Sequence, residues 1–247
     1  MTRHFDCFLT GALRHGRSKL TRKFHGQLPK PVLDQLKAAD DEMMARVSTQ
    51  FMELVREGGV EDRADFVDLV PDRDGPISSY ARAFDIVVTG SHPPDTSEEH
   101  AVAFPDLIAL QSGRPVLVVP PDYEASGLAD HALVAWDGKR SSARALGDAM
   151  PILEQKACVT ILTVGAVKPE GADILLRNLQ RHNISARYVT RPREGSVATT
   201  ILSAAEEFSA KLLVMGAFEH SKFSHDIMGG VTTDVMRDTS IPVLLSH

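Results

Sequence analysis

The sequence is poor in the residues that identify several large classes of protein. Its two cysteines in 247 residues, Cys7 and Cys158, are too few and too far apart for a disulfide framework or a cysteine metal site. No apolar run approaches the ~20 residues that cross a bilayer, and the N-terminus has no apolar signal core. We therefore expect a cytoplasmic protein that does not insert into a membrane.

Basic charge is scarce as well. The 27 lysines and arginines are outnumbered by 33 acidic residues, which gives a net charge of −6. Nucleic acids and anionic membrane surfaces attract basic proteins, so this balance argues against a general binder of either. One basic stretch runs from Arg14 to Lys23, but no aromatic residue alternates with its charges, and we interpret it as a solvated segment.

The two halves of the chain repeat one another. Residues 84–90 (FDIVVTG) correspond to 210–216 (AKLLVMG), an offset of 126, and the segment 112–120 (SGRPVLVVP) aligns with 239–246 (TSIPVLLS) through residue 119, an offset of 127. A register that holds to one residue indicates a tandem duplication. We predict one domain at 1–125 and a second at 128–247.

The second half alternates apolar strands with amphipathic helices. Strands are predicted at 131–136, 159–164, 184–189, 212–215 and 242–245. Ser141 or Ser142 is predicted to cap the first helix and Ser196 the third. This alternation favours a parallel sheet covered on both faces, and right-handed crossovers favour the flavodoxin-like strand order 3-2-1-4-5.

The first half has fewer strand–helix units. Strands are predicted at 5–9, 64–69, 85–89 and 115–119, with a long helix at 32–57. A central strand cannot be missing without leaving its neighbours unpaired, so we place 5–9 at the centre of a four-stranded sheet. The apolar stripe of the long helix is predicted to be core, with its two adjacent methionines as an alternative partner surface; it comprises Leu33, Leu36, Met43, Met44, Val47, Phe51 and Leu54.

In the second half, the first strand ends in Trp136-Asp137-Gly138, a later strand ends at Gly216 before a loop bounded by glycines, and the last strand is PVLL at 242–245. With these features the second half resembles the universal stress protein family. The resemblance covers 128–247 and extends to 1–127 through 85–90 and the GRPVLVVP segment. It implies an α/β fold of two tandem flavodoxin-like, adenine-nucleotide-hydrolase-like domains with parallel sheets, the first lacking one strand–helix unit.

Nucleotide-binding members of that family carry Gly-x2-Gly-x9-Gly followed by Ser or Thr, which hold the phosphates of ATP. Gly216 and Gly229 match the first and third glycines, but Glu219 stands at the second and Gly230 at the hydroxyl position. A carboxylate would repel phosphate, and loss of the hydroxyl removes about 1 kcal/mol, which Thr232 or Thr233 is placed to replace. The helix that opens at 229–232 attracts anions at its N-terminus.

The resemblance also assigns Asp137 to the nucleoside and implies ATP or AMP as the ligand. Trp136 either stacks on the base or packs beneath the crossover. The candidate binding residues are Ala135, Trp136, Asp137, Gly216, Gly229, Gly230, Val231 and Thr232. In the first half, Gly90 is followed by prolines 93 and 94, which have no amide donors, so we expect no nucleotide there.

No catalytic residue and no metal site is predicted. His220 and His225 lie in a loop without a third ligand at a suitable spacing, and no Gly-x-Ser-x-Gly motif is present. We predict a stress-response binding protein gated by an adenine nucleotide. Two alternatives stay open: an interaction or dimerisation module with a decayed nucleotide site, and a slow ATP-hydrolysing switch.

A homodimer is predicted from the end of the chain. The strand at 242–245 is apolar, and bare apolar edges promote uncontrolled pairing, so it requires a partner strand. Residues 116–119 of the same chain can supply that partner, and a second chain is then needed only to cover apolar surface that stays exposed.

Overall fold

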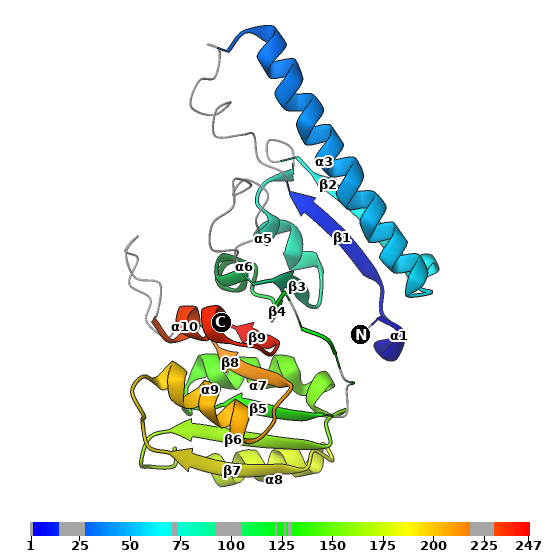
Figure 1. Cartoon of the computed structure of the whole chain (residues 1–247). Coiled ribbons are helices and arrows are strands. Elements are labelled where there is room, and N and C mark those ends of the chain that lie inside the picture. The colour runs from blue at the N-terminus through cyan, green and yellow to red at the C-terminus, as the bar shows by residue number, and fades with distance from the viewer. Residues whose placement is uncertain are drawn as a thin grey trace. The chain divides into compact units, whose positions relative to one another are not determined.

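The computed structural model describes residues 2–14, 28–70, 74–91, 105–121, 123–125, 127, 130–217 and 230–247. The chain is an α/β protein (Figure 1) with two compact units. The first contains Met1–Ile77 and Pro93–Val102, and the second contains Ser78–His92 and Ala103–His247. This division differs from the predicted domains at 1–125 and 128–247, whose boundary stays a prediction.

The second unit is built on a seven-stranded sheet with the order β3-β4-β9-β8-β5-β6-β7. Its five C-terminal strands have the order β7-β6-β5-β8-β9, which confirms the predicted 3-2-1-4-5 arrangement. The strands are β3 (Val87–Gly90), β4 (Val116–Val119), β5 (His131–Ala135), β6 (Cys158–Val164), β7 (Ala186–Arg191), β8 (Leu212–Gly216) and β9 (Val243–Ser246).

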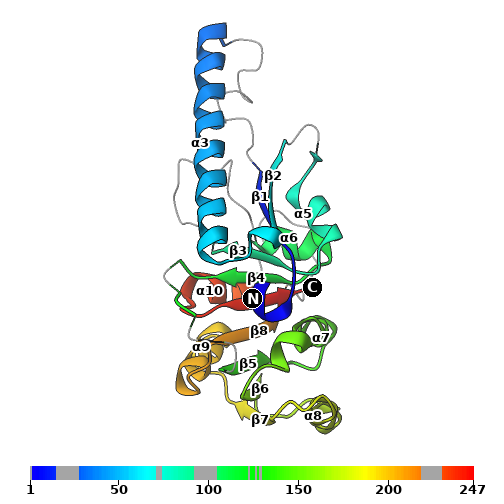
Figure 2. The ribbon, with the colours of Figure 1, turned by 90° about the vertical axis from the view of Figure 1, so that its right-hand side faces the viewer.

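Helices cover both faces of the five C-terminal strands. In Figure 2, α7 (Arg140–Leu153) and α8 (Ala172–Arg181) lie on one face, and α9 (Val197–Glu207) and α10 (Gly230–Asp238) lie on the other. Three shorter helical segments, α5 (Ile77–Tyr80), η2 (Ala81–Ala83) and α6 (Pro105–Ser112), precede β3 and β4. Leu133, Ile161 and Leu213 are fully buried, as expected for strands covered on both faces.

The helix caps were predicted with mixed success. Ser196 caps α9 as predicted, and its side chain accepts a hydrogen bond from the amide of Thr199. The predicted cap of α7 at Ser141 or Ser142 is wrong, because the N-cap residue is Lys139 and both serines lie inside the helix.

Strands β4 and β9 form the one antiparallel pair of this sheet, and they join the first half of the chain to the second. Val116 pairs with Leu245, Leu117 with Leu244, and Val118 with Val243. All six side chains are buried, with exposed fractions from 0% to 7%. Burial of a Val or Leu side chain stabilises by about 1.5–3 kcal/mol, so this junction is part of the core. The predicted pairing of the last strand within the chain is confirmed.

The first unit contains a separate two-stranded parallel sheet of β1 (Leu9–Arg14) and β2 (Ala64–Leu69). The predicted four-stranded sheet with 5–9 at its centre is wrong. Residues 2–5 form the short helix α1 (Thr2–Phe5), and Asp6 has a φ of 53°, a left-handed conformation that does not continue into a strand. Strands β3 and β4 belong to the larger sheet, where β4 covers the edge of β9.

The long helix α3 (Lys30–Glu57) packs on the two-stranded sheet through its C-terminal half, and the short helix η1 (Glu61–Arg63) connects it to β2. The rings of Phe51 and Phe66 lie 5.5 Å apart, and a Cβ on Gly11 would approach both rings within 2.8 Å, so a larger residue there would have to displace them. Val55 is the one buried residue of α3. The prediction that the whole apolar stripe is core is therefore wrong. None of the helices that the structure describes is long and apolar enough to cross a membrane.

Candidate functional site

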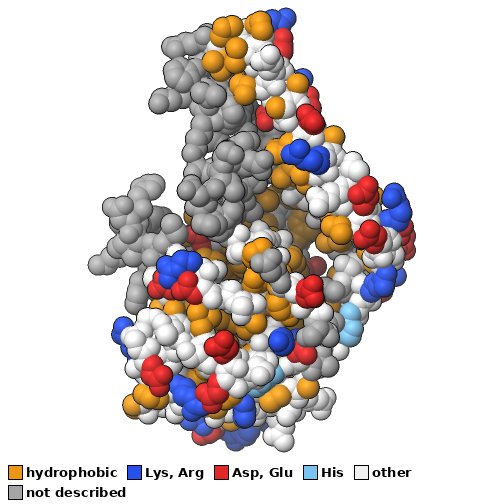
Figure 3. Space-filling model, in the orientation of Figure 1, with side chains coloured by type: hydrophobic (Ala, Val, Ile, Leu, Met, Phe, Trp, Pro, Cys, Tyr) orange, Lys and Arg blue, Asp and Glu red, His pale blue; other side chains and the backbone are white. Residues whose placement is uncertain are grey.

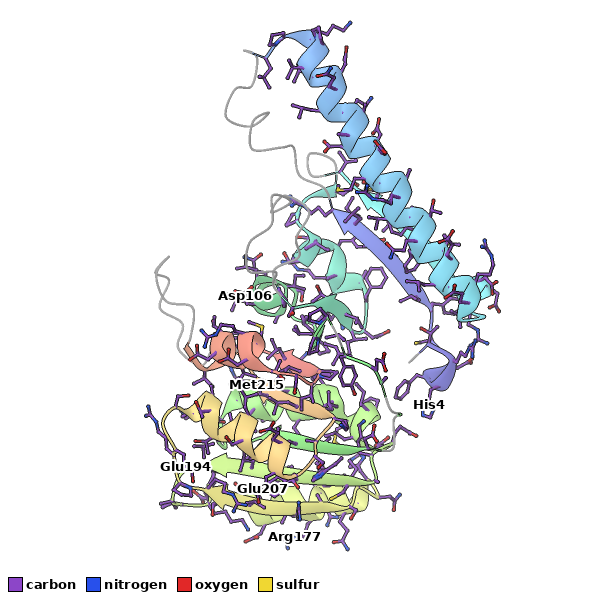
Figure 4. The ribbon with its side chains drawn as sticks, viewed as in Figure 1. His4, Asp106, Arg177, Glu194, Glu207 and Met215 are labelled. Carbon is purple, nitrogen blue, oxygen red and sulfur yellow. The ribbon has the colours of Figure 1, made fainter. Side chains whose placement is uncertain are left out.

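The predicted site lies at the carboxyl ends of β5 and β8, where the strand order reverses. Val134 pairs with Val214, so the same register brings Trp136 and Gly216 to neighbouring positions just beyond the paired residues. Figure 1 shows the start of α10 on the side of the sheet to which these strands point, and Figure 4 labels Met215, the residue before Gly216. Open α/β sheets bind ligands at such reversal points.

Most of the predicted residues come to this edge. Ala135 ends β5 and Gly216 ends β8, whereas Gly230, Val231 and Thr232 form the first turn of α10. Thr232 is buried, and Gly230 is exposed. Gly229 and Glu219 lie outside the described residues.

Asp137 is held in place by the first turn of α7. Its Oδ1 accepts a hydrogen bond from the amide of Lys139 at 2.9 Å and another from the hydroxyl of Ser142 at 2.6 Å. A carboxylate at this position satisfies backbone donors and stabilises the positive end of the helix dipole. Both bonds use Oδ1, which leaves Oδ2 of this exposed side chain available to a ligand.

Packing is by itself a sufficient reason for the glycine at position 216. A Cβ at this position would lie 2.6 Å from the carbonyl carbon of Ser141 and 2.6 Å from the amide nitrogen of Ser142, because the first turn of α7 crosses the end of β8. Gly230 differs, since among the described residues a Cβ there would meet only a carboxylate oxygen of Asp234, at 4.0 Å. The close approach of α7 therefore explains the first glycine of the motif without any phosphate. Gly230, in contrast, has room for a side chain.

Three buried polar atoms at this edge have no hydrogen-bond partner within the described part of the chain. They are Nε1 of Trp136, Oγ1 of Thr233 and Oγ of Ser246. Ser246 ends β9 beside Gly216 and is 1% exposed. An unsatisfied buried polar group costs about 1–3 kcal/mol, so buried groups are nearly always paired. Three such atoms at one edge fit a site whose donors and acceptors are completed by a ligand or by water.

Trp136 is half-buried, and its backbone is fixed by the neighbouring strands. The hydroxyl of Thr163 donates to the carbonyl of Trp136 at 2.5 Å, and the Tyr188 hydroxyl lies at the same distance from Thr163. An added Cβ on Gly138, where φ is 78°, would lie 4.0 Å from the indole nitrogen. The nitrogen edge of the ring therefore lies near Gly138.

Sequence reasoning missed a cluster next to Trp136. The Lys168 ammonium lies 4.8 Å from the centre of the Tyr188 ring and pairs with Asp173 at 2.5 Å. Burial raises the pKa of Tyr188, while its hydrogen bond with Thr163 and the charge of Lys168 act in the opposite direction. Lys168 comes four residues after the end of β6, so the rule that ligands collect beyond carboxyl strand ends could have found it.

No group of three His, Cys, Asp or Glu side chains suited to a metal occurs among the described residues. His220 and His225 lie outside them. A cavity of about 460 Å³ lies at the opposite end of the sheet, between the C-terminal ends of α9 and α10, where Glu206, Lys211 and Asp238 contribute to its lining. It is separate from the residues around Asp137.

Comparisons with known proteins agree with this geometry. Residues 175–247 match the model of the universal stress protein family. A universal stress protein of Synechocystis sp. is 26% identical over 167 residues, which cover 65% of this chain and 57% of that protein. The match thus spans less than two thirds of the relative's length.

Two solved structures share the fold over nearly the whole chain. A universal stress protein from Archaeoglobus fulgidus DSM 4304 superposes with a TM-score of 0.64 at 16% identity and covers 96% of this chain and 95% of that one. A putative universal stress protein from Pseudomonas aeruginosa UCBPP-PA14 gives 0.53 at 14% identity, covering 96% and 92%.

These findings define an α/β protein whose C-terminal sheet has the universal-stress arrangement, with the carboxyl edge as its candidate site. Residues 175–247 match the universal stress protein family, and nearly the whole chain shares the fold of the two solved universal stress proteins.

Proposed function

We propose that the protein acts in a stress response by binding an adenine nucleotide, ATP or AMP, at the carboxyl edge of the C-terminal sheet, without catalytic turnover. The observation that carries the proposal is the group of unpartnered buried atoms at Trp136, Thr233 and Ser246, which lies on the edge that also holds Asp137 and the start of α10. Their chemistry fits a ligand that brings both hydrogen-bond donors and acceptors.

Each part of the site has a role in this proposal. Asp137 would accept a hydrogen bond from the nucleoside through Oδ2, since Oδ1 is occupied by the α7 turn. The amides at the start of α10 would hold a phosphate group, because their positive dipole end attracts anions. Thr233 Oγ1, which is buried and unpartnered, would supply the hydroxyl that the family motif has at the position of Gly230.

Calorimetric titration with ATP and AMP tests this proposal, with GTP and inorganic phosphate as controls for the base and the phosphate. Trp136 is the only tryptophan, so its fluorescence gives an independent signal from the site. Asp137→Asn is the matched variant, because it retains an oxygen for the α7 turn and removes the charge. We expect one adenine nucleotide per chain and weaker binding by the variant. Failure of the wild-type protein to bind ATP or AMP would overturn the proposal.

One alternative function is supported by a specific observation. Because packing explains Gly216, the motif glycine does not by itself require a nucleotide, and the protein could be an interaction module whose site has decayed. Glu219→Gly separates the two cases. A gain of ATP binding by this variant indicates a weakened site, whereas undetectable binding in both forms indicates a lost one. Phosphate release from ATP would instead support the slow hydrolytic switch.

We also propose that the protein is a homodimer. The edge of β9 is already covered by β4, so a second chain would have to use another surface. The cytoplasmic location stays a prediction from the sequence.

A further inference from the structure

Helix α3 carries an apolar face that the described residues of the first unit leave partly exposed. The helix has 28 residues, or about 42 Å at 1.5 Å per residue, and only Val55 is buried. Val32 and Leu33 are each 37% exposed, and Leu54 is 60% exposed. Figure 2 shows α3 extending well beyond the ends of β1 and β2, and Figure 3 shows hydrophobic side chains gathered over its N-terminal end.

Seven residues on one side of the helix are exposed or half-buried. At 100° per residue they fall within an arc of about 80°, roughly a quarter-turn from Phe51 and Val55, which face the two-stranded sheet. We call this set the α3 seam: Val32, Leu36, Ala39, Met43, Val47, Gln50 and Leu54. None of these residues is buried.

We propose that the α3 seam is the homodimer interface and that it packs against the same seam of a second copy in antiparallel orientation. The spacing of the seam residues is symmetric about Met43: in each direction the next residues follow after four, three and four positions. A two-fold interface requires such self-complementarity, because each residue i that contacts j is matched by a j that contacts i. Met43 then lies on the two-fold axis, with Val32 opposite Leu54 of the second copy.

The charges beside the α3 seam fit this pairing near its centre. Arg46 and Glu42 lie on the same side of the α3 seam, and Arg46 of one copy comes within one turn of Glu42 of the other. The two-fold axis repeats this contact, so two attractive pairs flank Met43. Lys30 of one copy is level with Arg56 of the other, but both lie on the side of the helix away from the seam, where water and salt screen their repulsion.

The remainder of the first unit supports a second copy as the occupant. Among its described residues, the buried apolar side chains are Val55, Val60 and Leu69. Small units with few buried side chains commonly gain stability by oligomerisation. The inference names the surface of the homodimer proposed above and is independent of nucleotide binding.

Sedimentation and light scattering of the full chain test the interface. We expect a mass of twice 26.9 kDa for the wild-type protein at about 10 μM. Met43→Glu places two carboxylates together on the axis and should raise the dissociation constant by about a hundredfold or more. Ala45→Glu adds the same charge two residues away, on the exposed opposite side of α3, and should leave the dimer intact. Circular dichroism checks that both variants fold.

Crosslinking tests the orientation. In a Cys7→Ser, Cys158→Ser background, Val32→Cys and Leu54→Cys are prepared separately and then mixed under oxidising conditions. Positions 32 and 54 of one helix are about 33 Å apart, far beyond disulfide reach, so a 32–54 crosslink forms only between antiparallel copies. A monomeric wild-type protein would overturn the homodimer itself. A dimer that survives Met43→Glu, or that forms 32–32 crosslinks, would overturn this interface and leave the homodimer standing.

Discussion

Replacement of Gly216 by alanine is expected to destabilise the C-terminal sheet strongly. The added methyl group would lie 2.6 Å from two backbone atoms of α7, whereas ordinary van der Waals contact begins near 3.4 Å. The first turn of α7 would therefore have to move by roughly 0.8 Å, and it also holds Asp137 through Ser142. Overpacking of this kind typically costs about 1–3 kcal/mol, and we expect the upper end because backbone, not a flexible side chain, must shift.

The duplicated segment offers a matched control. Gly90 occupies the corresponding position at the end of β3, but a Cβ there would meet none of the described residues within 4 Å. Gly90→Ala should therefore be neutral or stabilise by up to about 1 kcal/mol, since alanine loses less conformational freedom on folding than glycine. Urea unfolding followed through Trp136 fluorescence measures both variants. Equal unfolding midpoints for Gly216→Ala and Gly90→Ala would refute the packing argument.

Three further predictions concern single side chains. Gly230→Ser should leave the free energy of unfolding unchanged, because the added side chain has room among the described residues. It should strengthen ATP binding about fivefold, since one added hydrogen bond contributes about 1 kcal/mol. Calorimetry that shows no gain in affinity would contradict this prediction. Thr233→Val removes a buried hydroxyl that has no partner within the described residues. In the absence of nucleotide it should raise the free energy of unfolding by about 1 kcal/mol, and it should weaken ATP binding. A lower unfolding free energy without nucleotide would argue against Thr233 as a ligand-binding hydroxyl. Burial lowers the pKa of Lys156, opposed by the charge of Asp130, so the folded state releases the proton more readily than the unfolded state. The wild type should then become more stable relative to Lys156→Met as the pH rises toward the ordinary lysine pKa, which unfolding curves at several pH values would measure.

The C-terminal half of the fold was predictable because its local signals agree with one another. Each strand from 131 to 245 is a short apolar run followed by a helix or a turn, and the chirality of crossovers then leaves few strand orders. The pairing of β4 with β9 was also predictable, since both runs are too apolar to remain at an edge. At residues 5–9 the local pattern misled, because a positive φ at Asp6 interrupts an otherwise strand-like sequence.

The candidate site was predictable in position but not in detail. A motif match cannot distinguish a glycine needed for phosphate from one needed for packing, and Gly216 is explained by the approach of α7. Likewise, the unpartnered atoms of Thr233 and Ser246 depend on which polar groups the fold buries, which no local pattern encodes. The stripe on α3 showed that a face of the helix needs covering, but not which neighbour covers it.

Because β4 and β9 belong to the same chain, their antiparallel pairing is an intramolecular interaction. A strand tethered to its own partner has a high effective concentration, so dilution does not separate the pair. Any related chain that offered a similar strand would compete against this tether and would be excluded from the β9 edge. Mixed assemblies through that edge are thereby prevented, and the pairing persists however scarce the protein is.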